Sequence, residues 1–333
     1  MEGVFYAACI QGGKGMKIIC TGSVAYDYLM KFPGYFKDHI LPDQLENISL
    51  SFLVDQMVKQ RGGVAPNIAY TLALLGARPM LFATVGEDFL DYRQWLESKG
   101  IDTRFARVIP GKFTASFFVN TDLANSQIAS FYTGAMADAA AMSIDEVKNE
   151  NPDLVVISPN DPGAMLKYVN ECRRLGIRYL YDPSQQLARL GGQELCEGVE
   201  GAYSLFVNEY EFGLLKKHTC LTDKEIENQV EILVVTLGRK GAEIYADGKK
   251  YSIPVVPETH IADPTGVGDA FRGGFLSGWR LGLDWQTCGQ MGSMAATYCL
   301  EQVGTQSHAY TPREFITRYR KHFDDNGALD ILL

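Results

Sequence analysis

Short apolar runs alternate with segments of helical periodicity along most of the chain. The runs predict β-strands at residues 17–21, 79–85, 154–157, 178–181, 204–207 and 232–236. Between them, residues 65–75 place Ile68, Leu72 and Leu75 on one helical face, and Gly76 is a typical C-terminal stop. Because nearly continuous apolar strands separated by helices are buried on both faces, the pattern predicts a three-layer α/β/α fold around a mostly parallel central sheet.

Three segments depart from this alternation. Residues 242–253 predict a hairpin, because Asp247-Gly248 provides a tight turn between two short runs. Residues 50–58 and 112–132 interleave polar with apolar positions, which predicts exposed strands. We expect these strands, from about 28–60 and 110–134, to form a small separate sheet. Such a sheet would act as a lid over the crevice at the carboxyl ends of the central strands.

Length, charge and cysteine content narrow the class of protein. The 333 residues suit one large α/β domain, expected over 16–333, with 1–15 as a disordered N-terminal extension. A net charge of −9 without any basic run argues against a nucleic-acid or anionic-membrane surface. No apolar run approaches the roughly 20 residues of a membrane span. Seven cysteines, an odd number without a CxxC pair, predict free thiols in a cytoplasmic protein.

The strongest chemical motif is a glycine-containing loop that runs directly into a helix. Residues 263–275 read DPTGVGDAFRGGF, and the loop at 265–268 precedes a helix with Phe271 and Phe275 on one face. Unpaired N–H groups at such a loop and helix start bind anions, and glycines allow a phosphate to approach the backbone. Asp269 at the helix entry can accept a proton from an attacking hydroxyl. The alternative is an ordinary turn with Asp269 as a helix cap.

Several polar clusters accompany this motif, and each also has a plain structural explanation. Ser23 and Asp27 follow the first strand, where open α/β sheets bind ligands, although loop residues of these types are often solvated. Gly63 and Asn67 stand at the start of the helix at 65–75, which could be a simple loop-to-helix junction. Asn208 and Glu211 have the spacing of a capping box.

The two glycine-rich strings together resemble the signatures of the ribokinase-like (PfkB) carbohydrate kinases. The C-terminal signature of that family is Asp-Thr-x-Gly-x-Gly-Asp, from which this chain departs by Pro264 between the aspartate and the threonine. The resemblance implies a ribokinase-like fold with Asp269 as catalytic base. It also implies an anion hole formed by Thr265, Gly266, Val267 and Gly268. The site of the phosphate acceptor would be formed by Ser23, Asp27, Gly63 and Asn67.

The same resemblance implies ATP and Mg²⁺ as cofactors and leaves activation by K⁺ open. The string at 208–211 is similar to the Asn-x-x-Glu element that organises magnesium and phosphate in the family, so Glu211 would act on the metal through water. The string at 236–241 resembles a turn that lies against ATP. The implied ATP-binding residues are Asn208, Thr236, Leu237, Gly238, Arg239, Lys240, Gly241, Thr265 and Gly268.

Finer strings resemble the mycobacterial-type adenosine kinases over nearly the whole chain from Met16. They lie at residues 21–34, 49–55, 127–136, 182–190 and 255–272. The resemblance implies that adenosine is phosphorylated on its 5′-hydroxyl, and that the lids pair two subunits in a homodimer. The implied nucleoside-binding residues are Ser51, Phe117, Phe131, Gln185 and Gln186.

Other readings of this site remain open at the level of sequence. Phe117 and Phe131 could sandwich a purine, but they could equally be strand core, and paired glutamines are often surface residues. A sugar kinase of the ribokinase or fructokinase type would need no aromatic platform. A non-catalytic nucleotide-binding sensor would have no need of Asp269.

Overall fold

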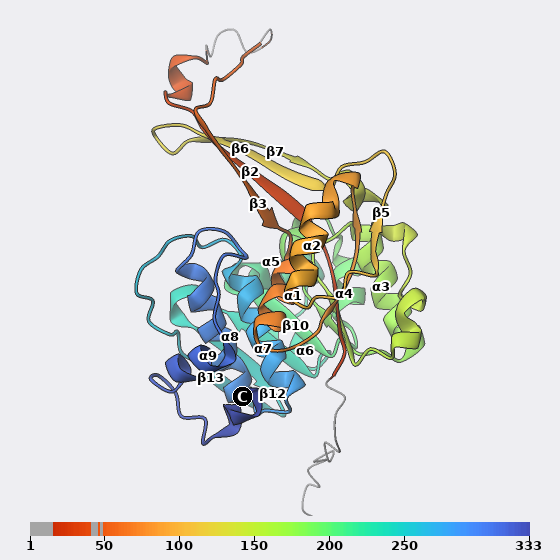
Figure 1. Cartoon of the computed structure of the whole chain (residues 1–333). Coiled ribbons are helices and arrows are strands. Elements are labelled where there is room, and N and C mark those ends of the chain that lie inside the picture. Colours follow the sequence, from red (N-terminus) through yellow and green to blue (C-terminus); the bar gives the residue numbers. More distant parts are fainter. Residues whose placement is uncertain (1–15, 41–45, 47–48) are drawn as a thin grey trace, which may run out of the picture.

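The apolar runs assemble into one extended sheet in the computed structural model, which describes residues 16–40, 46 and 49–333 (Figure 1). The strands of this sheet are β1 (Ile18–Thr21), β4 (Met80–Val85), β5 (Ala106–Val108), β8 (Leu154–Ile157), β9 (Tyr179–Tyr181), β10 (Ser204–Asn208), β11 (Ile232–Thr236), β12 (Ala242–Ala246) and β13 (Lys249–Ile253). Among these residues the order is β13-β12-β11-β10-β9-β8-β1-β4-β5. Neighbours from β11 to β5 are parallel, whereas β12 and β13 form an antiparallel edge.

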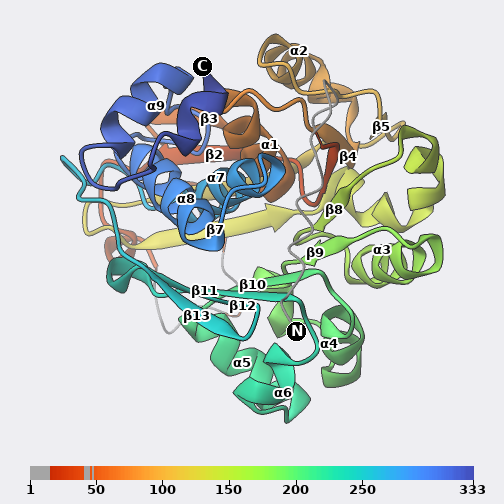
Figure 2. The ribbon, with the colours of Figure 1, turned by 90° about the horizontal axis from the view of Figure 1, so that it is seen from below.

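Helices cover both faces of the sheet, as the view from below shows (Figure 2). The α-helices are α1 (Val64–Leu74), α2 (Leu90–Ser98), α3 (Pro162–Leu175), α4 (Gly192–Val199), α5 (Glu209–Thr219), α6 (Asp223–Glu227), α7 (Val267–Arg280), α8 (Trp285–Leu300) and α9 (Pro312–Tyr319). Successive strand residues point to opposite faces, so Ile18 packs in the core with Phe275 of α7, and Ile19 in the core with Tyr168 of α3. The predicted three-layer arrangement is therefore confirmed.

Short 3₁₀-helices connect many of these elements. They are η1 (Phe36–Asp38), η3 (Glu87–Phe89), η4 (Gly134–Ala141), η5 (Ile144–Glu150), η6 (Ser184–Ala188), η7 (Gly238–Lys240) and η8 (Ala328–Leu332). Two of them, η6 after β9 and η7 after β11, begin where central strands end. They therefore lie at the carboxyl edge of the sheet, where ligands bind in this class of fold.

A second, smaller sheet stands apart from the α/β body, at the top of Figure 1. It consists of β2 (Ala25–Lys31), β3 (Gln56–Gly62), β6 (Ala115–Thr121) and β7 (Gln127–Tyr132), in the order β3-β2-β6-β7. Asp122 forms the turn between β6 and β7 by accepting hydrogen bonds from the backbone N–H groups of Ala124 and Ser126, both at 2.8 Å. The expected small sheet is thus present.

The predicted start of β3, one strand of this small sheet, was wrong. The strand expected over 50–58 begins only at Gln56, and residues 50–54 have no regular structure. The apolar residue that suggested a strand, Phe52, instead packs against Phe32 and Phe36 with ring centroids 5.1 and 4.9 Å away. The loop that contains Phe52 therefore has the same alternation of polar and apolar residues as a half-buried strand, although its apolar residue packs in an aromatic cluster. The expected extension at 1–15 lies outside the described residues.

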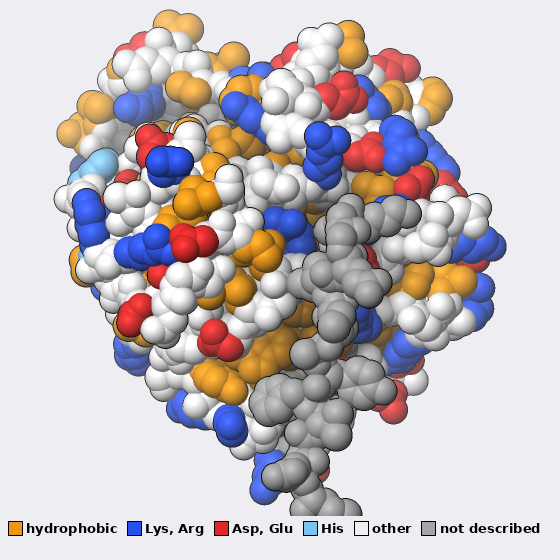
Figure 3. Space-filling view, turned by 60° about the horizontal axis from the view of Figure 1, so that its bottom comes forward, with side chains coloured by type: hydrophobic (Ala, Val, Ile, Leu, Met, Phe, Trp, Pro, Cys, Tyr) orange, Lys and Arg blue, Asp and Glu red, His pale blue; other side chains and the backbone are white. Residues whose placement is uncertain are grey.

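Other features of the described residues bear on the class of protein. None of their helices combines the length and apolar character required to cross a bilayer. On the face drawn in Figure 3, basic and acidic side chains are interspersed, without an extended basic patch. The six cysteines in the described part of the chain are free thiols, and Cys9 lies outside it.

Candidate functional site

The loop before α7 has the backbone geometry of an anion site. Gly266 is the residue before the helix and has a φ of 77°, and a Cβ there would approach Thr305 to 2.8 Å. Asp263 fixes the approach to the loop, because its carboxylate accepts the N–H groups of Thr265 at 2.9 Å and Gly304 at 3.1 Å. The N–H groups of the first helical turn have no intrahelical acceptor, so they are available to an anion.

Asp269 lies in the first turn of α7 and is held in a fixed position. Its Oδ2 accepts a hydrogen bond of 2.9 Å from Nδ2 of Asn67, near the start of α1. The amide of Asn67 is oriented in turn, because its Oδ1 accepts from Thr305 at 2.8 Å and Gln306 at 2.9 Å. Enclosure by protein raises the pKa of Asp269 to about 6, although Arg272 and Asn67 act in the opposite direction. A carboxylate with this pKa suits proton abstraction near neutral pH.

The start of α1 approaches the loop after β1 very closely. Gly63 precedes the helix with a φ of 98°, and a Cβ there would lie 2.5 Å from the backbone oxygen of Ser23. The hydroxyl of Ser23 accepts the N–H of Val64 at 3.2 Å. Only glycine fits this backbone conformation and spacing, which explains the glycine at position 63.

The small sheet presents a row of side chains to the body of the protein. Its register aligns Gln60, Asp27, Phe117 and Phe131 across β3, β2, β6 and β7. Side chains at paired positions lie on the same face of a sheet, so a carboxylate stands beside two aromatic rings. Burial, together with the nearby charge of Asp263, raises the pKa of Asp27 to about 6.

The segment after β9 contributes amide and charged groups. Gln185 is exposed, whereas Gln186 is buried and its Oε1 has no hydrogen-bond partner within the described chain. Asp182, at the end of β9, accepts a hydrogen bond of 2.7 Å from Nη2 of Arg272 on α7. A buried oxygen without a partner in the protein is a feature that a ligand can satisfy.

The ends of β10 and β11 bring Asn208 and Thr236 side by side in the sheet register. Asn208 caps α5 by accepting the N–H of Glu211 at 2.8 Å, and Glu211 accepts the N–H of Asn208 at 2.8 Å. The capping box inferred from the spacing is therefore present. The second oxygen of Glu211 lies 3.3 Å from the hydroxyl of Ser184.

These groups line one cavity of about 790 Å³ between the small sheet and the α/β body. The predicted residues that line it are Ser23, Asp27, Gly63, Asn67, Phe117, Phe131, Gln185, Gln186, Asn208, Glu211, Thr236, Thr265, Gly266, Gly268 and Asp269. A carboxylate with a raised pKa, an anion-binding helix start and two aromatic rings thus share one space. This arrangement can deprotonate a hydroxyl, hold a phosphoryl group and cover a planar ring.

Other predicted residues lie outside the cavity lining. Ser51 is exposed in the segment before β3, and Val267 begins α7 beside the lining residues Gly266 and Gly268. The turn after Thr236 is closed by a hydrogen bond of 2.8 Å from the N–H of Leu237 to the oxygen of Gly241. Thr236 lines the cavity, but the residues of the turn that follows it do not. These residues are Leu237, Gly238, Arg239, Lys240 and Gly241.

Among the lining residues that were not singled out from the sequence, three adjoin the loop before α7, namely Arg272, Asp263 and Thr305. Arg272 had a usable signal, because a residue three positions after Asp269 on a helix shares its face. Asp263 belongs to the motif but was not assigned a role. Thr305 gave no local signal, since its place beside Gly266 results from a tertiary contact.

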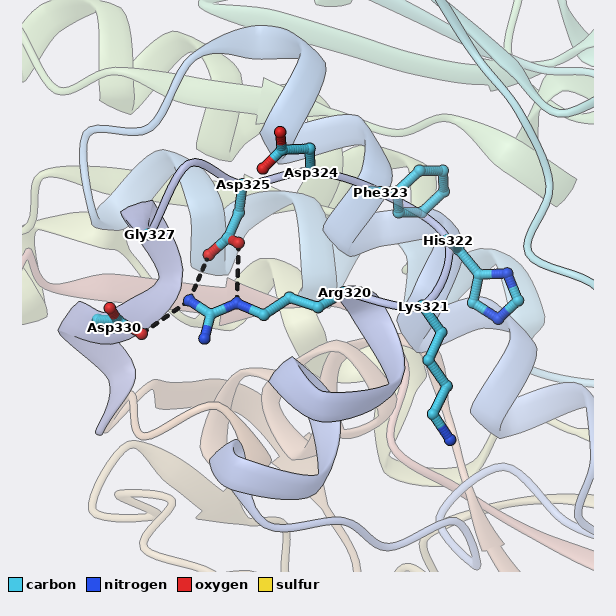
Figure 4. A pocket seen from close by; sticks show the side chains of 8 residues that line it. All are labelled: Arg320, Lys321, His322, Phe323, Asp324, Asp325, Gly327 and Asp330. Atoms are coloured by element: carbon cyan, nitrogen blue, oxygen red, sulfur yellow. Dashed lines mark hydrogen bonds and ion pairs between the residues drawn. The ribbon is translucent and has the colours of Figure 1, made fainter.

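A second hollow near the C-terminus does not have these features (Figure 4). Arg320 points toward Asp325 and Asp330 there, and it donates to both oxygens of Asp325 at 2.9 and 2.8 Å and to Asp330 at 2.7 Å. Its charge is therefore neutralised within the protein. We interpret the arrangement as a structural crosslink of the C-terminal segment.

Comparison with known proteins places the chain in a family. The model of the pfkB family carbohydrate kinases matches residues 22–312. A nucleoside kinase of Methanocaldococcus jannaschii is 31% identical over 319 residues, which cover 93% of this chain and 99% of that protein.

Solved structures agree with this assignment. The structure of Burkholderia thailandensis nucleoside kinase in ligand-free form has a TM-score of 0.84 and 36% identity, covering 91% of this chain and 99% of that one. The structure of the same enzyme in complex with inosine has a TM-score of 0.82 and 34% identity, with coverages of 92% and 97%. The shared fold, the motif around Asp269 and these similarities lead to one conclusion: this chain belongs to the pfkB family of carbohydrate kinases, with a ribokinase-like fold.

Proposed function

We propose that this protein is an ATP-dependent nucleoside kinase that phosphorylates the 5′-hydroxyl of adenosine, giving AMP and ADP. The observation that carries the proposal is that Asp269 and the pair Phe117 and Phe131 line the same cavity. The relatives named nucleoside kinase, one of them in complex with inosine, support a nucleoside as acceptor.

We expect these residues to divide the work of phosphoryl transfer between them. Asp269 takes the proton of the hydroxyl as its oxygen forms a bond to the γ-phosphorus. The bond from that phosphorus to the bridging oxygen breaks, and its electron pair leaves with ADP. The N–H groups of the loop formed by Thr265, Gly266, Val267 and Gly268 hold the migrating phosphoryl group.

The nucleoside would bind between the small sheet and the body. Asp27 and Asn67 bind the remaining ribose hydroxyls, beside Ser23 and Gly63. Phe117 and Phe131, which pair across β6 and β7 on the same face of the small sheet, cover one side of the base. The unpartnered Oε1 of Gln186 favours a base with an amino group, because a donor would satisfy this buried acceptor. Gln185 is the adjacent amide.

ATP would bind along the ends of β10 and β11. Asn208 and Thr236 line the cavity, and the turn at 237–241 follows Thr236 directly along the chain. Glu211 is a lining carboxylate, and the described residues contain no cluster of three His, Cys, Asp or Glu that could hold a metal. This donor set fits Mg²⁺ held mainly by water and phosphate, with Glu211 acting through water. Magnesium supplies charge neutralisation on the phosphates when bound, and K⁺ is a further candidate activator.

We also propose a cytoplasmic homodimer that associates through the small sheet. Apolar side chains are exposed on this sheet, with Met57 at 62% and Val58 at 52%. Ser51 is exposed in the segment before β3, the strand that carries Met57 and Val58. In a dimer formed through this sheet, Ser51 would reach the nucleoside site of the second copy. Sedimentation at several protein concentrations would detect the dimer, and a monomer at all of them would contradict this part of the proposal.

A panel of acceptors tests the nucleoside assignment. ATP turnover would be measured with adenosine, guanosine, inosine, ribose and fructose, and adenosine is expected to have the highest kcat/KM. Phe117→Ala should raise the KM for adenosine by about tenfold, since loss of one aromatic contact costs about 1 kcal/mol or more. Phe118→Ala is the matched control, because Phe118 is the next residue of β6 and stacks on Tyr28 at 4.8 Å.

The outcomes separate the proposal from a sugar kinase. Higher kcat/KM with ribose or fructose, and an acceptor KM unchanged in Phe117→Ala, would contradict a nucleoside kinase. An equal effect of Phe117→Ala and Phe118→Ala would indicate damage to the small sheet and would remove the support for a base platform.

A further inference from the structure

A buried ion pair lies beneath the proposed catalytic carboxylate. Arg272 follows Asp269 by three positions and Gly268 by four on α7, so the three residues share one face of the helix. Its Nη2 donates to Oδ1 of Asp182 at 2.7 Å. Arg272 is 7% exposed and Asp182 only 1%, which excludes a solvated surface pair.

The hydrogen-bonding capacity of this pair is not used up by the protein. Nε of Arg272 and Oδ2 of Asp182 are both buried without a partner among the described residues. A Cβ built on Gly268 would lie 2.9 Å from Nη1 of Arg272, so one edge of the guanidinium faces the anion-binding loop. Arg272 also lines the cavity itself. A buried guanidinium with free donors beside a phosphate site has the geometry of an anion ligand.

The charges of the cavity make this cation significant. Four carboxylates line it, those of Asp27, Glu211, Asp263 and Asp269. The cations among its lining residues are Arg272 and Arg189, and Arg189 is exposed directly after η6, three positions beyond Gln186. A polyphosphate that enters this space meets a negative field, so positive charge near the reacting phosphorus has a large effect.

We propose that Arg272 supplies positive charge to the transferring phosphoryl group, and that Asp182 holds its guanidinium against the Gly268 end of the loop. This role rests on the phosphotransfer proposed above. As the hydroxyl oxygen bonds to phosphorus and the bond to the bridging oxygen breaks, the equatorial oxygens carry the charge that Arg272 faces. Arg272 keeps its proton throughout, and Asp269 accepts the proton of the hydroxyl.

The competing explanation is that Arg272 serves only to neutralise Asp182 in the core. The two explanations differ in what the substitution of Arg272 changes. A neutralising residue affects stability, whereas a residue that interacts with the migrating phosphoryl group affects kcat more than the nucleoside KM. A residue acting through its charge is also replaced in part by lysine, which keeps the charge but not the planar fork.

Three variants test the role by steady-state kinetics, with kcat and both KM values measured. Arg272→Met should lower kcat by about 100- to 1000-fold, the range for removal of one donor to a developing oxyanion. The nucleoside KM should stay within about threefold, because that interaction is made in the transition state. Arg272→Lys should fall between Arg272→Met and the unmodified protein.

Arg280→Met is the matched control on the same helix. Arg280 is also substantially buried, donates to the backbone oxygen of Leu75 at 3.1 Å and lies outside the cavity lining. Its substitution should leave kcat within about twofold. A kcat for Arg272→Met that matches that of Arg280→Met would overturn the proposed role of Arg272. Equal losses in Arg272→Met and Arg272→Lys would contradict a role for its charge.

A double variant distinguishes a loss of catalysis from a loss of folding. Arg272→Met alone leaves Asp182 as an uncompensated buried carboxylate, which destabilises a protein. Arg272→Met combined with Asp182→Asn should recover the melting temperature but keep the low kcat. Recovery of kcat in the double variant would overturn the role. Absence of acceptor-dependent turnover in the unmodified protein would overturn the proposed function, whereas normal turnover in Arg272→Met would overturn this inference alone.

Discussion

Two arginine–carboxylate pairs with buried carboxyl groups differ in how many of their polar atoms are hydrogen-bonded. In the C-terminal region, Arg318 of α9 donates to both oxygens of Glu301 at 2.7 Å, and Thr259 donates its N–H to Glu301 at 2.7 Å. Beneath the cavity, Arg272 makes a single bond to Asp182, and both partners retain a buried atom without a hydrogen bond within the described chain.

The pKa values of the two carboxyls move in opposite directions. Burial acts to raise the pKa of Glu301, but the hydrogen bonds from Arg318 and Thr259 outweigh it and hold this pKa at about 2. At Asp182, burial outweighs the attraction of Arg272, and the negative neighbours Glu211 and Asp269 add to the rise of its pKa. One pair is stable as ions, and the other is electrostatically strained.

This difference distinguishes a structural pair from one at a functional cavity. A fully bonded pair stabilises the fold and has no capacity left for a ligand. Groups that interact with a substrate must keep capacity and charge that the protein itself does not satisfy, so strained electrostatics are concentrated at such sites.

The largest effect is expected from Asp269→Asn, which removes the proposed base but keeps the size of its side chain. The kcat should fall by about 1000-fold or more, since general base catalysis contributes up to about 10⁴. Binding of adenosine and ATP, measured by calorimetry, should survive because Asn can retain a hydrogen bond with Asn67. A turnover close to that of the unmodified protein would contradict Asp269 as the base.

Glu301→Gln breaks the fully satisfied pair and should mainly affect stability. At pH 7 we expect a loss of about 2 kcal/mol in the free energy of unfolding, below the value for a completely buried pair because Arg318 is partly exposed. The contribution of a carboxyl with a lowered pKa is present above 4.5 and is lost as the pH falls toward about 2.

Urea unfolding of both proteins at pH 7 and pH 3.5 measures this contribution. The difference between them should shrink at the lower pH, while kcat at pH 7 stays unchanged. A difference that is independent of pH would indicate that Glu301 does not act through its charge.

The pH dependence of turnover tests the raised pKa values of the carboxyl groups in the cavity. With nucleoside saturating, kcat should be constant above about pH 7 and fall about tenfold per pH unit below 6, because Asp269 must be deprotonated and its pKa is raised to about 6. The kcat/KM profile should fall more steeply, since Asp27 also has a pKa of about 6 and titrates in the free enzyme. A kcat that stays constant down to pH 5 would contradict the raised pKa of the base.

The smallest effect on stability is expected from Asp182→Asn. The new amide oxygen can still accept from Arg272, whose positive charge is still attracted by Asp269 and Glu211. The carboxylate that is replaced is itself strained, so we expect a change of about 1 kcal/mol or less. Urea unfolding beside Glu301→Gln provides the comparison. A loss in Asp182→Asn that exceeds the loss in Glu301→Gln would reverse the interpretation of the two pairs.

Much of the fold follows from local patterns. The strands β8 and β11 and the hairpin of β12 and β13 have the bounds that the apolar runs and the Asp247-Gly248 turn predicted. The strand predicted over residues 50–58 was wrong in its first half. The packing of Phe52 against Phe32 and Phe36 depends on tertiary contacts that cannot be predicted from a local pattern.

The chemistry of the loop before α7 and the set of polar residues at the strand ends could be read from the sequence. These signals are local, since a glycine turn, a helix start and a carboxylate lie within a few residues. The positions of these residues relative to one another depend on the packing of the whole fold, because Asn67 and Asp269 are 202 residues apart and Arg272 and Asp182 are 90 apart. The strain of the second pair depends on burial and on neighbouring charges, and both arise only when distant segments pack together.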